Sequence, residues 1–250
     1  YGGGKAVIMA DSKSPKNKKF LFQYAKKVNL LNGKFYTGGD VGMLEKDVDI
    51  LSKSSNFIVG RTGVAGDPSP WAALGVFYSI KVGLEFLFGS KKITGHTFAI
   101  KGLGKVGLEL CRLLHENGGQ IVMTDTNPQV LKNAKKIFPE AKIVYPEEIH
   151  KEQVDVYSPC ALGKEFNKKT INQLNCKMVC GAANNQLVTE DAGFELYKRN
   201  ILYIPDYVAN SGGLINVKDE LNPHGYSRKR VENKVRRIGK TVKQIIEVSK

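Results

Sequence analysis

The chain has 250 residues, of which 42% are hydrophobic and 25% charged. This length allows one large domain or two ordinary ones, and the composition excludes a disordered or collagen-like chain. No signal peptide is visible, and we see no apolar run approaching the ~20 residues of a membrane span. The net charge of +14 comes from short basic runs spread along the sequence, which favours a lysine-rich surface over a nucleic-acid or membrane partner.

The first 66 residues predict two helices and two strands. Apolar segments at 6–10 and 34–37 predict strands. Helical spacing of apolar residues predicts a helix over 18–31 and another around 44–51. The segment 60–70, GRTGVAGDPSP, is rich in glycine and proline. It predicts a boundary between domains 1–66 and 67–250.

The second part alternates strands with helices. Ser69 and Pro70 predict the start of a helix that ends near Gly89. Strands are predicted at 97–101, 120–124, 141–144, 154–157, 177–180 and 202–204. This order predicts an α/β fold, a Rossmann-type doubly wound parallel sheet, with part of a second α/β domain before it. The tail 227–250 predicts one basic amphipathic helix packed on the domain.

A full GxGxxG motif follows the first strand of that sheet, at Gly102, Gly104 and Gly107. In such a motif the glycines allow a tight turn, close approach of a pyrophosphate, and close packing of helix and strand. Asp125 ends the next strand, about 20 residues further on, where an acid bonds the adenosine ribose. Its charge favours NAD over NADP. A glycine-rich turn without a ligand is the alternative.

Two further residues in tight loops suit proton transfer. Lys5 follows a run of glycines, and Asp40 lies within GGDVG. A lysine there could bind a carboxylate or act as a base, and a carboxylate on a loop can move protons. A surface lysine and an Asx turn are the alternatives.

Polar and small residues also follow three later strands, at 159–163, 181–186 and 210–214, where a nucleotide cleft would lie. Ordinary turn chemistry is the alternative there. The four cysteines lack metal-ligand spacing, so we expect no metal site and buried, reduced thiols in a cytoplasmic protein. The four histidines lie in no nucleophile context, and we expect them at the surface or at helix caps.

Taken together, these motifs resemble the Glu/Leu/Phe/Val dehydrogenase family, in its leucine dehydrogenase branch. The matching segments are GGGKAVI, GGDVG, GDPSP, GLGKVG, SPCALG, GAANNQL and PDYVANSGGLINVKDE. The resemblance implies reversible oxidative deamination of an amino acid to a 2-oxo acid and ammonia, with NAD taking the hydride. It also implies a homo-oligomer.

The resemblance assigns roles to individual residues. Lys5 would be the catalytic base, and Asp40 would shuttle protons at the substrate nitrogen. Asn184 and Asn210 would contact the cofactor or the polar end of the substrate. The remaining expected cofactor-binding residues are Lys105, Val106, Thr126, Cys160, Ala161, Leu162 and Ala182.

The resemblance places Gly38, Leu214 and Val217 in the substrate pocket. Because Val217 replaces a hydroxyl residue of glutamate enzymes, it implies leucine, valine or isoleucine as substrate, with phenylalanine as an alternative. Two departures are notable. Ala72 stands where a threonine contacts the nicotinamide, which leaves a catalytically impaired NAD-binding regulatory protein as an alternative. The chain lacks an initiator methionine and an upstream lysine, so we expect a partial chain that is inactive alone.

Overall fold

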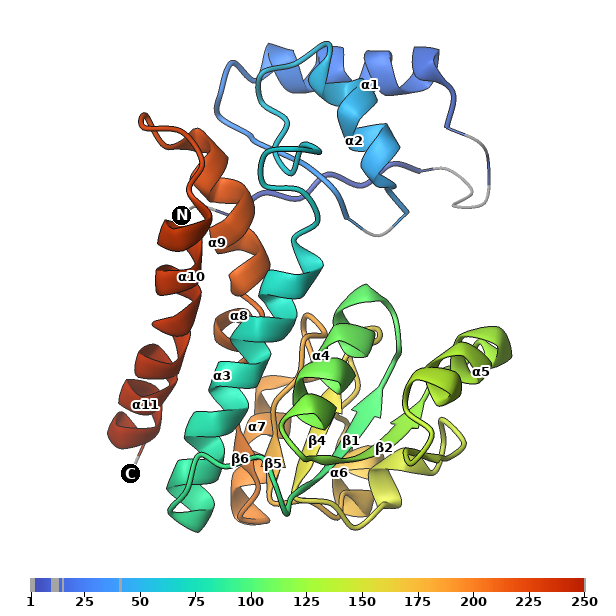
Figure 1. The fold of residues 1–250 in the computed structure, drawn as a ribbon, viewed down its shortest axis with the longest axis vertical. Coiled ribbons are helices and arrows are strands. Elements are labelled where there is room, and N and C mark those ends of the chain that lie inside the picture. The colour runs from blue at the N-terminus through green and yellow to red at the C-terminus, as the bar shows by residue number, and fades with distance from the viewer. Residues whose placement is uncertain (1–2, 10–13, 15, 41, 250) are drawn as a thin grey trace. The chain divides into compact units, whose positions relative to one another are not determined.

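The computed structural model describes residues 3–9, 14, 16–40 and 42–249. It divides into two compact units (Figure 1). The first unit combines Tyr1–Pro68 with Leu214–Val231, and the sheet unit combines Ser69–Gly213 with Glu232–Lys250. Residues 214–231 thus group with the N-terminal part, whereas the sequence placed them in a domain spanning 67–250.

The sheet unit is built on a six-stranded parallel sheet of order β3-β2-β1-β4-β5-β6. This is the Rossmann-type order, which confirms the predicted fold class. Two predicted strands have the expected bounds, three are shorter than predicted, and the strand predicted at 154–157 has the expected length but begins two residues later. The strands are β1 Thr97–Lys101, β2 Gln120–Thr124, β3 Lys142–Ile143, β4 Val156–Pro159, β5 Met178–Val179 and β6 Leu202–Tyr203.

Helices cover both faces of this sheet. On one face, α3 (Ser69–Phe88) packs against α4 (Lys105–Glu116) and against α11 (Ile238–Val248). On the other face, Ala99, Tyr157 and Val179 form a core with η1, α6 and α7. The remaining helices of this unit are α5 Pro128–Ile137, η1 Ile149–Lys151, α6 Lys168–Gln173, α7 Glu190–Lys198 and α8 Asp206–Ala209.

Helix α3 corrects the expectation that no apolar run approaches the length of a membrane span. By length and composition alone, this 20-residue helix could cross a membrane. Half of its most apolar stretch is buried inside the protein, as in the core helix of a globular domain. Close contacts explain part of this burial, because a Cβ on Gly83 would lie 2.1 Å from the sulfur of Met178.

The first unit contains the two predicted helices, α1 (Lys18–Leu30) and α2 (Glu45–Ser52), and they pack against each other. Its core is formed by Leu21, Ala25, Val28, Val48, Leu51 and Ile58. The strand prediction for 6–10 is wrong over residues 6–9, which are exposed and not in a strand, while Ala10 lies outside the described residues. In place of the predicted strand 34–37 there is a single parallel bridge between Thr37 and Ile58.

The C-terminal segment contains α9 (Gly212–Lys218), η2 (Asp219–Leu221) and α10 (Arg228–Arg236), followed by α11. The single helix predicted over 227–250 is therefore divided in two. The division lies at Arg237, whose carbonyl accepts from Thr241 N as in a regular helix. Two further bonds join Arg237 N–H to Lys234 O and Lys240 N to Arg237 O. These bonds span three residues, the tighter pattern of a 3₁₀ turn, which interrupts the regular helix.

Candidate active site

The glycine loop has the geometry that its motif predicts. Gly102 has a φ of +95°, and a Cβ there would lie 2.8 Å from the Cβ of Ala161. A Cβ on Gly107 would lie 1.9 Å from Gly102 O, so α4 approaches the loop too closely for any side chain. Gly104, by contrast, faces open space. It caps α4 without a side-chain hydrogen bond, and Lys105 and Val106 form the first turn.

Asp125 lies beside this loop and helps to shape it. Its Oδ2 accepts a hydrogen bond from Leu103 N at 2.7 Å, and its Oδ1 accepts from Asn127 N at 2.8 Å. The carboxylate thus fixes the loop between Gly102 and Gly104, a role that the motif did not predict. Because an ionised carboxylate accepts about four hydrogen bonds, these two leave capacity for ribose hydroxyls. Thr126 is exposed next to it.

The loop after β4 runs beside the glycine loop. Cys160 N donates to Lys101 O at 2.8 Å, which places Cys160, Ala161 and Leu162 at the end of β1. Leu162 is 80% exposed. Burial raises the pKa of the Cys160 thiol to about 11. All four cysteines are free thiols, and Cys111 and Cys180 are buried while the other two are half-buried.

The structure brings together the two asparagines that the sequence selected 26 residues apart. Asn210 Nδ2 donates to Asn184 Oδ1 at 2.7 Å and to Ala182 O at 3.1 Å. Asp206 supports this pair, because its buried carboxylate accepts from Asn185 N at the start of α8. The loops after β5 and β6 therefore present a fixed pair of amides at the carboxyl edge of the sheet.

A half-buried ionic cluster at the carboxyl end of β1 was missed by the sequence reasoning. Lys101 Nζ donates to both oxygens of Glu165, at 2.8 and 2.9 Å, and Tyr157 OH donates to one of them at 2.8 Å. Burial, and then the charge of Glu165, raise the pKa of Tyr157 well above its usual value. The available signal was Lys101 itself, a charge on a strand position that alternation turns inward.

Histidine placement corrects another expectation. His150 lies in η1 and is 7% exposed, not at the surface. It is held by α6, where its Nε2 lies 3.0 Å from Gln173 Oε1. Burial, and then the charge of Lys101, lower its pKa below the usual value. His96 is half-buried, with its Nδ1 3.1 Å from Asp155 Oδ2.

In the first unit, the two residues proposed for proton transfer form an ion pair. Lys5 Nζ donates to Asp40 Oδ2, although the residues lie 35 positions apart. Both side chains are open to solvent, with exposed fractions of 66% and 50%. An ammonium and a carboxylate in direct contact, reachable from solution, can exchange protons with a bound reactant.

The three residues expected in the substrate pocket also belong to this unit. A Cβ on Gly38 would lie 2.4 Å from Val59 O, so only glycine fits where the backbones of residues 38 and 59 meet. The missing side chain therefore leaves no open space beside Gly38. Val217 is half-buried, and its Cγ1 lies 3.6 Å from where a Cβ on Gly60 would stand. Leu214 is 54% exposed. Among these three residues, the two apolar side chains are thus on α9.

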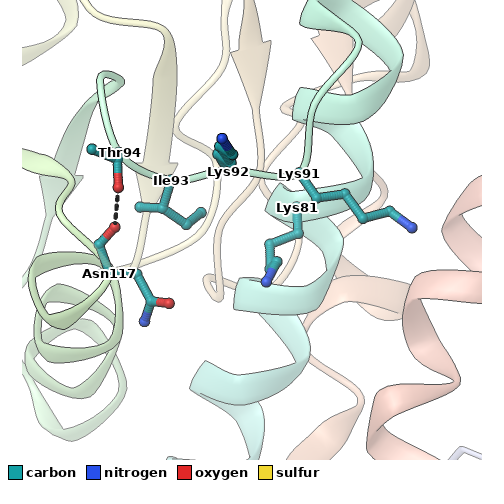
Figure 2. A pocket seen from close by; sticks show the side chains of 6 residues that line it. All are labelled: Lys81, Lys91, Lys92, Ile93, Thr94 and Asn117. Atoms are coloured by element: carbon teal, nitrogen blue, oxygen red, sulfur yellow. Dashed lines mark hydrogen bonds between the residues drawn. The ribbon is translucent and has the colours of Figure 1, made fainter.

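A cavity of about 290 Å³ is lined by none of the predicted site residues. Figure 2 shows the residues that line it. Its lining residues, Lys81, Lys91, Lys92, Ile93, Thr94 and Asn117, precede β1 or follow α4 and so mark the opposite edge of the sheet from the glycine loop. Lys91 pairs with Glu85 at 3.1 Å, and Lys81 lies over the Phe77 ring. Lys91 and Lys81 thus have partners within the protein, and we assign no function to the cavity.

Comparison with known proteins gives the family. Residues 123–249 match the Glutamate/Leucine/Phenylalanine/Valine dehydrogenase family. Leucine dehydrogenase of Bacillus subtilis (strain 168) is 39% identical over 99% of this chain and 68% of its own length. L-tryptophan dehydrogenase of Nostoc punctiforme is 42% identical over 100% of this chain and 70% of its own length. Its crystal structure superposes with a TM-score of 0.80 at 41% identity, covering 100% of this chain and 71% of that one. The chain therefore belongs to the Glu/Leu/Phe/Val family of amino acid dehydrogenases.

Proposed function

We propose that this protein catalyses the reversible, NAD-dependent oxidative deamination of a branched-chain L-amino acid. The amino acid, NAD⁺ and water would give the 2-oxo acid, NADH, ammonium and a proton. The observation that carries the proposal is the ion pair between Lys5 and Asp40, because it places a proton donor and a proton acceptor in one exposed position. The two residues were selected from separate glycine-rich segments, and the fold joins them.

These side chains would divide the proton transfers. Lys5, in its neutral amine form, would remove a proton from the water that attacks the substrate carbon. Asp40 exchanges protons with the substrate nitrogen, which must lose one before deamination and gain one as ammonia leaves. NAD⁺, when bound, would supply the hydride acceptor. Each proton transfer would then be made by a group on a loop of the first unit.

The sheet unit fits a dinucleotide. The pyrophosphate would meet the backbone at Gly104 and the N–H groups of the first turn of α4, where no side chain stands in the way. Asp125 would accept hydrogen bonds from the adenosine ribose and repel a 2′-phosphate, which supports NAD over NADP. Ala161 and Leu162 would contact the adenosine, and the pair Asn184–Asn210 would bind the ribose or nicotinamide.

The side chains of Leu214 and Val217 support an aliphatic substrate, because neither could bind a side-chain carboxylate. An aromatic amino acid is the second candidate. The tryptophan enzyme of Nostoc punctiforme and the phenylalanine dehydrogenase of Bacillus thermotolerans are 42% and 41% identical to this chain. Since one methylene contributes only ~1–3 kcal/mol to discrimination, we expect several aliphatic amino acids to be accepted.

The test is NADH formation by the full-length protein with leucine, valine, isoleucine, phenylalanine, tryptophan or glutamate. Lys5→Ala should lower turnover by about 10²–10⁴-fold, the usual contribution of a positioned acid–base group. Lys198→Ala removes an exposed lysine from an ion pair on α7 and is the matched control. NAD binding without turnover on any substrate would instead favour the regulatory alternative, and Ala72→Thr would then test whether the nicotinamide contact is missing.

A further inference from the structure

Glu220 has the environment of a residue that holds a loop in place. Its side chain is fully buried, with 0% exposure, although it carries a charge. Its Oε1 accepts hydrogen bonds from Gly60 N at 3.1 Å, Arg61 N at 3.0 Å and Ala65 N at 2.9 Å. Its Oε2 accepts one from Arg61 Nε at 3.1 Å. Four donors from one short loop therefore converge on a single carboxylate about 160 residues away.

Further bonds fix the same segment. Asn216 Nδ2 donates to Ala65 O at 3.0 Å, and Tyr226 OH donates to Asn216 Oδ1 at 2.9 Å. The neighbouring Asp219, also fully buried, accepts two hydrogen bonds from the Arg230 guanidinium, at 2.7 and 2.6 Å. Segment 216–220 is thus fixed on one side to loop 60–65 and on the other to the start of α10.

This arrangement connects the substrate-pocket residue Val217 to the Lys5–Asp40 pair. Val217 lies against Gly60, which Glu220 binds. The preceding residue, Val59, packs on Gly38 and donates its N–H to Thr37 O at 2.8 Å. Gly38 lies two residues before Asp40. A continuous series of contacts within the first unit therefore leads from Glu220 to the proton-transfer pair.

We propose that Glu220 is a positioning residue for substrate specificity, which rests on the function proposed above. By holding loop 60–65 against α9, it sets where Val217 stands relative to Lys5 and Asp40. It therefore controls how well the substrate side chain fits while the amino group meets the proton-transfer pair. The charge is needed because Oε1 and Oε2 together accept four donors. In Glu220→Gln the volume stays the same, but an NH₂ group would face either Arg61 Nε–H or the three backbone N–H groups.

The experiment is a double-mutant cycle in the full-length protein with Glu220→Gln and Val217→Ala. The readouts are kcat and KM for leucine, valine and phenylalanine, KM for NAD⁺, and amide hydrogen exchange of residues 60–66. Glu195→Gln, which removes the charge from an exposed ion pair on α7, is the control, alone and combined with Val217→Ala. Steady-state kinetics then separate substrate placement from cofactor binding.

We expect Glu220→Gln to lower kcat/KM for leucine about tenfold or more, since small misplacements cost up to 10²-fold. The ratio between leucine and phenylalanine should change, KM for NAD⁺ should not, and residues 60–66 should exchange faster. Because Glu220 would act through Val217, its effect on that ratio should be non-additive with Val217→Ala, whereas Glu195→Gln should add independently.

Two results overturn the inference while the proposed function stands. One is an unchanged substrate ratio in Glu220→Gln, and the other is full additivity with Val217→Ala. Faster exchange at 60–66 with an unchanged ratio would make Glu220 a structural anchor only. If the unmodified protein turns over no amino acid, the proposed function fails first, and the specificity role fails with it.

Discussion

Substitution by alanine should affect NAD binding at the second glycine of the GxGxxG motif and stability at the third. Gly104→Ala should leave the fold intact and weaken NAD binding, whereas Gly107→Ala should destabilise the loop itself. The two positions lie three residues apart at the start of one helix, and each change adds one methyl group. Any difference between them therefore comes from what that methyl group meets.

At Gly107 the added Cβ would lie 1.9 Å from Gly102 O, 3.0 Å from Gly102 C and 3.2 Å from the Cβ of Cys160. The first contact is with backbone, so helix α4 or the glycine loop must shift. Overpacking of this kind costs about 1–3 kcal/mol. For a domain of this size each kcal/mol lowers Tm by about 2–4 °C. Gly107→Ala should thus show a clear loss of stability before any cofactor is added.

At Gly104 nothing lies within 4 Å of the added Cβ, and the backbone angles of −67° and −170° suit any L-residue. Alanine is a poorer N-cap than glycine, by about 0.5–1 kcal/mol. Restricting the unfolded chain returns about 0.4–1 kcal/mol. The two terms nearly cancel, so the free energy of unfolding should stay within about 0.5 kcal/mol. Any loss of NAD affinity then reports the methyl group standing where the pyrophosphate approaches.

The assay is thermal unfolding without cofactor, together with calorimetric titration of NAD⁺ into each variant. We expect Gly104→Ala to bind NAD⁺ at least about tenfold more weakly, a loss of ~1.4 kcal/mol, with an unchanged Tm. Wild-type affinity in Gly104→Ala would refute the placement of the pyrophosphate at this turn. An unchanged Tm in Gly107→Ala would refute the argument from close packing.

Three other predictions concern charge and protonation. Asp125→Asn should weaken NAD⁺ binding and reduce the protein's preference for NAD⁺ over NADP⁺, because the 2′-phosphate then meets no carboxylate. Calorimetric titration with both cofactors measures this preference. An unchanged preference would mean that other residues select the cofactor. Burial lowers the pKa of His150, so the unfolded chain binds more protons than the folded one and stability should fall as pH drops below ~6.5. In thermal unfolding, His150→Gln should reduce the dependence of Tm on pH in this range. An identical dependence would exclude His150 as its source. Partial burial raises the pKa of Cys160 to about 11 and of Cys176 to about 12, so their thiols should react slowly with a disulfide reagent at pH 8 until the chain unfolds. Fast labelling of the native protein would contradict the raised pKa values.

The strands that the sequence located correctly are those with the strongest local signal. In β1 and β2, each strand has three or four buried residues in a row, as central strands covered on both faces require. The strand β3 is reduced to two exposed residues at the sheet edge, and its apolar neighbours Ala141 and Val144 lie outside the ladder. For 6–10 and 34–37, propensity alone indicated strands, but a strand also needs a partner, which a single sequence does not show.

The candidate site divides in a similar way. Its exposed polar residues could be found because each lies in a segment rich in glycine or asparagine, as Lys5, Asp40 and Asn184 do. The carboxylates of Glu165 and Glu220 could not, because their partners are backbone N–H groups or side chains elsewhere in the chain. In sequence they read as ordinary surface charges, since most glutamates are exposed.

This difference has a consequence for the chemistry. A buried carboxylate without donors is costly, so its position is fixed by the donors around it. Glu220 fixes the loop next to Val217, and Glu165 fixes the end of β1 next to Gly102. Each glutamate thus holds a segment that adjoins residues proposed to contact substrate or cofactor. Because positioned groups lose rate steeply when displaced, changes at these two glutamates should affect catalysis as strongly as many changes at the exposed site. Motifs therefore indicate the groups that we propose to react, whereas we expect the acids held by several donors to determine how well those groups are placed.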